Sequence, residues 1–182
     1  MSYYDVDAIL TDAQKVPCTF EITIPNGGYL DGNPGQDMKE GTRVELPLWL
    51  ATMLSSGILS FTQGQAPISI ELPTPLSQRV INALKADPRS VDLRAQASHF
   101  YGLAALAFEI FEDEDTVDVL LDTFKSRGAL LSDHANNLHG ALSGGGEGTE
   151  FLRGLDELER KLFRATHDGA KAVGMWIKEG KT

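Results

Sequence analysis

The spacing of apolar residues changes character part-way along this chain of 182 residues. Up to about residue 73, apolar and polar residues alternate, as in residues 18–24, and this pattern predicts half-buried β-strands. Further along, apolar residues recur every third or fourth position, which predicts amphipathic helices. The two patterns together predict an α+β fold, in which a small β-rich domain precedes a mainly α-helical bundle.

The segment Pro73-Thr74-Pro75 marks the predicted domain boundary, because a capping threonine followed by proline is typical of a helix start. Residues 1–73 are expected to hold a short N-terminal helix and about four strands, one of them at 58–61. Residues 74–182 are expected to hold about four helices and a flexible glycine-rich loop at 143–148. A first domain this short buries only ~60% of its surface, so we expect its stability to depend on contacts with the helical part or with a partner.

Two further helix starts are predicted from capping signals. Asp87 followed by Pro88 predicts a long helix that continues through Phe111. Thr149 predicts the start of a last helix. The apolar face of that last helix carries Phe151, Leu155, Leu158, Leu162, Ala165, Gly169, Val173 and Trp176, and Leu152, Phe163, Ala170 and Ile177 lie off it.

The charge balance excludes several classes of partner. Lys and Arg number 16 against 26 Asp and Glu, for a formal net charge of −10, so a general nucleic-acid surface or docking on anionic lipid is not expected. Cys18 is the only cysteine, which excludes an internal disulfide and fits a reducing compartment. We find neither a secretory signal nor a run of ~18 apolar residues, so no membrane association is expected.

The sequence offers no convincing reactive centre. Cys18 is in phase with the apolar face of its predicted strand, and the four histidines lack metal-ligand spacing. The glycine run 144–148 precedes a helix but lacks the Lys and Ser/Thr of a phosphate-binding loop. Asp31, Asp37 and Glu40 lie among glycines, without the rigid frame that paired carboxylates need, and an enzyme using them is the weaker alternative. We therefore predict no catalytic, cofactor-binding or metal-binding residues, and no enzyme.

The helical half carries more large apolar side chains than about four helices readily enclose. The candidates for a partner interface are Phe100, Tyr101, Phe108, Phe151, Phe163 and Trp176. An obligate subunit interface typically covers ~2,000 Å² or more and resembles a core cut in half. The alternative interpretation is that these side chains fill the hydrophobic core of the chain's own helical bundle. A minority hypothesis, direct DNA contact, rests on the basic residues Arg79, Lys85, Arg89 and Arg94 around the helix junction.

Several segments resemble the Psf-three family of GINS replication proteins. In chain order they are residues 3–10 (YYDVDAIL), 15–20 (KVPCTF), 28–32 (GYLDG), 44–50 (VELPLWL), 87–93 (DPRSVDL), 99–101 (HFY) and 151–156 (FLRGLD), followed by Glu159, Leu162 and Phe163. The segments are spread along nearly the whole chain and keep the family's order. Each motif is only moderately specific, but their co-occurrence is a strong signal.

The resemblance implies the permuted GINS order, with the β-rich domain before the α-helical domain. It implies a nuclear, non-catalytic subunit of a heterotetramer with Sld-five, Psf-one and Psf-two, without a cofactor. That tetramer joins Cdc-forty-five and the MCM ring in the replicative helicase and supports initiation and elongation of DNA replication. The alternative that stays open is a replication accessory protein that binds nucleic acid directly.

Overall fold

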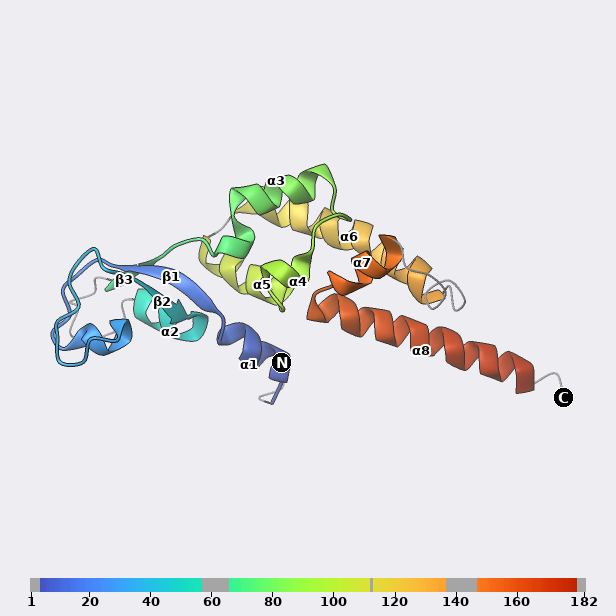
Figure 1. Ribbon diagram of the computed structural model, residues 1–182, viewed down its shortest axis with the longest axis horizontal. Coiled ribbons are helices and arrows are strands. Elements are labelled where there is room, and N and C mark those ends of the chain that lie inside the picture. The colour runs from blue at the N-terminus through green and yellow to red at the C-terminus, as the bar shows by residue number, and fades with distance from the viewer. Residues whose placement is uncertain (1–3, 57–65, 112, 137–146, 180–182) are drawn as a thin grey trace. The chain divides into compact units, whose positions relative to one another are not determined.

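The computed structural model describes residues 4–56, 66–111, 113–136 and 147–179 (Figure 1). The chain forms two compact units, Met1–Thr74 and Pro75–Thr182. A small antiparallel sheet in the first and a mainly helical second unit confirm the predicted α+β class. The strand predicted at 58–61 and the part of the glycine-rich loop at 143–146 lie outside the described residues. No described helix is long and apolar enough to span a bilayer.

The first unit is built around a sheet in the order β2-β1-β3, with both neighbours antiparallel to β1. Its elements are α1 (Val6–Asp12), β1 (Lys15–Phe20), the 3-10 helix η1 (Gly27–Asp31), β2 (Arg43–Pro47), α2 (Leu48–Ser55) and β3 (Ile68–Ile70). Alternate residues of β1 (Val16, Cys18 and Phe20) are fully buried, and α2 adds Leu48 and Ala51 to this core. The predicted alternation is confirmed for Cys18 and Phe20, but the strand runs from Lys15 to Phe20, and Ile22 and Ile24 of the predicted strand 18–24 lie beyond its end.

Pro17 lies inside β1, which begins at Lys15. The carbonyl of Pro17 accepts a hydrogen bond from the N–H of Glu71, the residue that follows β3. The missing N–H of the proline therefore falls where the neighbouring strand has already ended. A proline is tolerated at such a place because it lies at the end of the β1–β3 ladder, where the missing N–H removes only the reciprocal bond to Glu71.

The second unit is helical. Its elements are the 3-10 helix η2 (Thr74–Leu76), α3 (Gln78–Ala86), α4 (Leu93–Gln96), α5 (Phe100–Phe111), α6 (Glu114–Asn136), α7 (Glu147–Arg153) and α8 (Glu157–Glu179). Its core consists of Leu76, Ile81, Leu84, Leu93, Phe100, Ala104, Ala107 and Leu120. The helices α3 to α6 thus share one apolar core through their inward residues.

The unbroken helix predicted from Asp87 through Phe111 is wrong. The Asp87 carboxylate caps only a turn, by accepting the N–H of Arg89 at 3.0 Å. Asp92 caps α4 instead, and Ala97 ends it in an extended conformation. The physical reason is that an Asp side chain stabilises a turn as readily as a helix start. The break also frees the carbonyl of Ser98 to accept the N–H of Glu157, at the start of α8.

The last helix predicted from Thr149 is also divided. Thr149 lies within α7, and the chain breaks between Arg153 and Glu157. A reciprocal capping box starts α8: Asp156 accepts the N–H of Glu159 at 2.8 Å, and Glu159 accepts the N–H of Asp156 at 3.3 Å. The stronger cap therefore determines where the long helix begins.

Candidate partner interface

A buried ion pair holds α8 against α6. The side chains of Arg127 and Glu159 are both fully buried, and two hydrogen bonds of 2.7 and 2.9 Å join them. The guanidinium also donates to the carbonyls of Pro88 at 2.9 Å, Val91 at 3.0 Å and Gly154 at 3.4 Å. Arg127 therefore connects the segment before α4 with the α7–α8 junction. A buried arginine is tolerated only when its donors are paired in this way.

Two further groups complete this polar network. The hydroxyl of Tyr101 donates to Glu159 at 3.2 Å, and the Asp156 carboxylate accepts the N–H of Tyr101 at 3.3 Å. Burial raises the pKa of Asp156, and the two backbone N–H groups that it accepts only partly offset this. Burial and the nearby Glu159 charge raise the pKa of the Tyr101 phenol, so it stays protonated and donates to Glu159 even in alkaline solution.

Gly154 lies where α4 meets the α7–α8 junction. Its carbonyl accepts the N–H groups of Leu93 and Arg94 at 3.0 and 3.2 Å. A Cβ at this position would lie 3.2 Å from the Cα of Asp92, tighter than ordinary van der Waals contact. Because the ion pair is sealed from solvent, the network cannot receive a substrate. It fixes the start of α8 in position and orientation.

The orientation of α8 follows from this fixed residue. Glu159 points inward, so residues four, seven and eleven positions later share its side of the helix. These are Phe163, Thr166 and Ala170, and all three are partly buried. The stripe identified from sequence as the apolar face, from Leu158 to Trp176, is instead turned outward.

We define the outer face of α8 as Leu158, Leu162, Ala165, Gly169, Val173 and Trp176. The exposed fractions of its large side chains are 44% for Leu158, 40% for Leu162, 57% for Val173 and 74% for Trp176. These positions recur at intervals of three and four along almost the whole helix. Such a continuous exposed apolar stripe is typical of a helix that packs against another protein.

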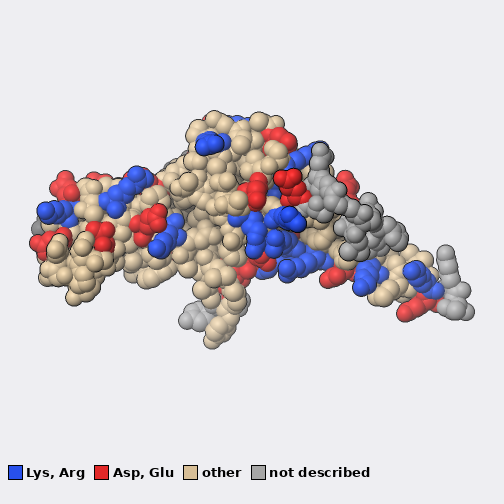
Figure 2. All heavy atoms as spheres, in the orientation of Figure 1, with Lys and Arg blue, Asp and Glu red and all other residues tan. Residues whose placement is uncertain are grey.

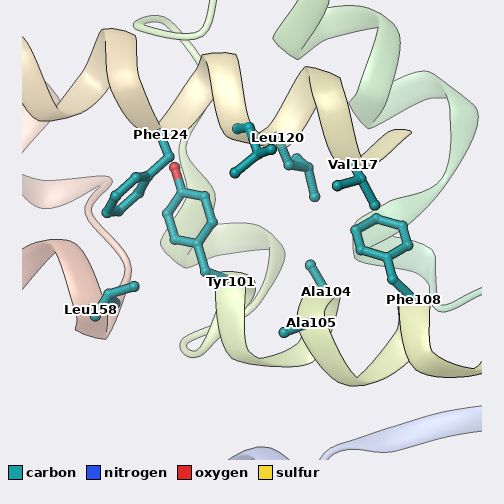
Figure 3. A pocket seen from close by; sticks show the side chains of 9 residues that line it. Tyr101, Ala104, Ala105, Phe108, Val117, Leu120, Phe124 and Leu158 are labelled. Carbon is teal, nitrogen blue, oxygen red and sulfur yellow. The ribbon is translucent and has the colours of Figure 1, made fainter. Parts of the chain in front are cut away.

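An apolar groove adjoins the first turn of this face (Figure 3). It encloses about 250 Å³ and is lined by Tyr101, Ala104, Ala105 and Phe108 of α5, Val117, Leu120, Leu121 and Phe124 of α6, and Leu158 of α8. Figure 3 shows the α5 and α6 side chains facing one another across the groove, with Leu158 at one end. The Tyr101 hydroxyl, the only polar side-chain group of this lining, is already bonded to Glu159.

Two family descriptions match the two units. Residues 4–56 match the PSF3 N-terminal domain, and residues 75–178 match the GINS complex protein helical bundle domain. This chain belongs to the PSF3 family of GINS proteins.

Curated relatives agree with the PSF3 assignment over their whole length. The DNA replication complex GINS protein psf3 of Aspergillus fumigatus is 57% identical over 181 residues, covering 100% of this chain and 99% of the relative. The Phaeosphaeria nodorum protein PSF3 is 57% identical over 180 residues, with 99% and 98% covered. The Saccharomyces cerevisiae protein PSF3 is 32% identical over 191 residues, with 97% and 98% covered. The resemblance stated from sequence is thereby confirmed.

The six aromatic residues predicted for a PSF3 partner interface occupy different environments. Phe100 is fully buried in the core of its own unit and has no surface to offer a partner. Tyr101, Phe108, Phe151 and Phe163 are half-buried, and Trp176 is 74% exposed. Phe151 lies under the Arg127 guanidinium, 4.9 Å from its ring centroid, and so packs against the polar network. Tyr101 and Phe108 line the groove, whereas Trp176 lies near the far end of the outer face of α8.

Sequence reasoning missed the polar network. One available signal was Arg127, which interrupts the apolar stripe of α6 between Leu120 and Leu131 at spacings of seven and four. The other was the Asp-x-x-Glu pattern of a capping box at Asp156. Neither signal names its partner, because Arg127 and Glu159 are 32 residues apart. Within the described ranges, no group of three His, Cys, Asp or Glu side chains is placed to hold a metal ion.

Proposed function

We propose that this chain is a non-catalytic structural subunit of the GINS complex and supports initiation and elongation of DNA replication. Its partners would be Sld-five, Psf-one and Psf-two in a heterotetramer, and Cdc-forty-five and the MCM ring in the helicase assembly. The site of action would be the nucleus. Support comes from membership of a family whose relatives are named DNA replication complex GINS proteins.

The single observation that carries the proposal is the outer face of α8. Burying a large apolar side chain contributes ~1.5–3 kcal/mol, so Leu162, Val173 and Trp176 offer a partner substantial binding energy. In the free chain, these side chains face water along a helix that its own unit covers only on one side. A partner helix that packs along this stripe would complete the core.

Gly169 adds a second argument from the same face. A glycine inside a helix costs ~1 kcal/mol relative to alanine. No atom of the described residues lies within 4 Å of a Cβ placed at Gly169, so packing within this part of the chain does not require the missing side chain. Close approach of a partner backbone would explain why the position lacks one.

The test is assembly with the other three GINS subunits by co-expression and affinity measurement. Leu162→Asn and Trp176→Asn should each weaken assembly by ~2–4 kcal/mol, or about 30- to 1,000-fold in affinity. Arg164→Asn is the matched control, because Arg164 is exposed on the opposite side of α8. Wild-type affinity in a chain that carries both outer-face changes would contradict the proposed interface.

A second candidate function, direct nucleic-acid binding, rests on a row of basic residues on α8. Arg164, Lys171 and Lys178 are exposed, seven residues apart, on the side away from the outer face. Figure 2 shows Lys and Arg gathering over the α8 region of the drawn surface. Lys171→Glu with Lys178→Glu should reduce DNA retention by the tetramer and lower its salt slope by about two, if these side chains contact phosphates. An unchanged salt slope would exclude the row as a DNA contact.

A further inference from the structure

The groove between α5 and α6 exists because two small side chains lie between two large ones. Ala104 and Ala105 face it between Tyr101 and Phe108, while Leu121 on the opposite wall is 51% exposed. Figure 3 shows the space between these helices flanked by rings at both ends. The unit's own side chains therefore leave apolar surface open to solvent at this point.

The chemistry of the groove restricts what can occupy it. Its volume of about 250 Å³ lies below the ~300–1,000 Å³ of typical small-molecule pockets, so it fits one or two side chains. Its lining is apolar, and the Tyr101 hydroxyl already donates to Glu159. A phosphate, a sugar or a polar cofactor would find no side-chain partner there. The occupant is therefore an apolar side chain.

The charges around the groove indicate what flanks that side chain. Glu109 on α5 and Asp118 and Asp122 on α6 are exposed beside the lining residues. Lys125 pairs with Asp122 at 3.1 Å and balances one of these charges. The rim is therefore net acidic, which favours a partner segment with Lys or Arg next to its apolar residue.

We propose that this groove receives a large apolar side chain from an amphipathic helix of another GINS subunit, flanked on that helix by Lys or Arg. The inference rests on the proposed function and identifies a second contact of the same interface. Leu158 belongs both to the groove and to the outer face of α8, so the two apolar surfaces are continuous. From Leu158 to Trp176 the helix rises ~27 Å, which a partner helix of about 18 residues matches. A helix docked in an apolar groove is a recurrent mode of recognition.

Thiol footprinting tests this directly. Cys18, the only native cysteine, is fully buried, so a cysteine introduced at Ala105 is the only accessible thiol of this chain. Ala83→Cys on α3 is the matched control, because Ala83 is also an exposed helical alanine of the same unit. Alkylation of this subunit is followed by mass spectrometry in the free chain and in the purified heterotetramer. Assembly should slow alkylation at position 105 by at least tenfold and leave position 83 unchanged.

Filling the groove gives an independent readout. Ala105→Trp should reduce tetramer affinity at least tenfold, because the indole would occupy the groove. Ala83→Trp places the same residue on an exposed helix surface outside the groove and should leave the affinity unchanged. Asp118→Lys with Asp122→Lys should weaken assembly, and Asp133→Lys, further along α6, should not. Phe108→Asp is less informative, because Phe108 also packs against the core of its unit.

The outcomes separate the two proposals. Failure of the wild-type chain to assemble with the other subunits would contradict the proposed function itself. A stable tetramer in which position 105 is alkylated as fast as in the free chain would overturn the groove proposal alone. Equal protection at positions 105 and 83, or an unaffected Ala105→Trp tetramer, would also overturn it. Protection of position 105 in the free chain that depends on its concentration would show a second copy as the occupant, and would overturn it as well.

Discussion

Replacing Arg127 by methionine should destabilise the helical unit by about 3–5 kcal/mol, the usual cost of removing one partner of a buried ion pair. Methionine fills much of the space of the arginine stem but donates no hydrogen bond. The Glu159 carboxylate, fully buried, would lose both guanidinium bonds and keep only the Tyr101 hydroxyl and the Asp156 N–H. The carbonyls of Pro88 and Val91 would each lose a donor.

A double-mutant cycle identifies the origin of that cost. Glu159→Gln removes the buried negative charge but keeps an oxygen that can accept from Tyr101. The Arg127→Met/Glu159→Gln chain should therefore be more stable than the sum of the single effects predicts, by about 2–3 kcal/mol. The reason is that the second change removes the uncompensated charge left by the first.

The assay is urea unfolding of the full chain followed by far-UV circular dichroism. The described helices α3 to α8 lie in the second unit, so this signal reports mainly on that unit. Equal m-values for the four proteins would show that the same surface unfolds in each. A loss below ~1 kcal/mol for Arg127→Met, or strictly additive effects, would refute the assigned role of the ion pair.

Three further outcomes are expected. Gly154→Ala should cost ~1–3 kcal/mol, because its Cβ would crowd the Asp92 backbone. Gly128→Ala, whose added Cβ would have no atom of the described residues within 4 Å, should raise stability by up to ~1 kcal/mol. If the two variants shifted the urea midpoint by similar amounts, the close contact between Gly154 and the Asp92 backbone would be contradicted. Burial raises the pKa of the Cys18 thiol from 9.0 to about 11 and also shields the sulfur from reagent, so alkylation at pH 8 should be at least ~100-fold slower in the native chain than in urea. Equal rates would show that the thiol is accessible. Because burial raises the pKa of Asp156 above its ordinary 3.8, its contribution to stability should decline as pH rises from that value through the raised pKa. Asp156→Asn should flatten the dependence of the unfolding free energy on pH over this range. A stabilising contribution of Asp156 that grows as pH rises would contradict the raised pKa.

Local signals in the sequence were sufficient for the fold class and for the order of its β-rich and helical parts. The alternation around Cys18 and the three-to-four spacing after residue 75 predicted sheet and helix correctly. Both depend only on which side of a strand or helix a side chain occupies, so they can be recognised from neighbouring residues alone. Family membership was recognisable for a similar reason, since it rests on short motifs in a fixed order.

The helix breaks were less accessible to sequence reasoning. The signal at Asp87 and Pro88 was genuine, but the turn that it stabilises does not continue into a helix. Asp92 and Asp156 form the caps that α4 and α8 use. Choosing among several competent capping residues requires knowing which backbone groups find a partner elsewhere. At Ser98 and Gly154 those partners lie on other helices.

The sequence by itself determined the secondary-structure classes, the α+β order, the acidic charge and the amount of apolar surface on α8. Only the tertiary structure decided which apolar stripe of α8 faces the bundle and which remains exposed. Both stripes, around Leu162 and around Phe163, have helical spacing, so periodicity cannot separate them. The contact between Arg127 and Glu159 across 32 residues sets the rotation of the helix. A buried charge must meet its partner, and this non-local requirement outweighs the preference of the larger apolar side chains for the interior.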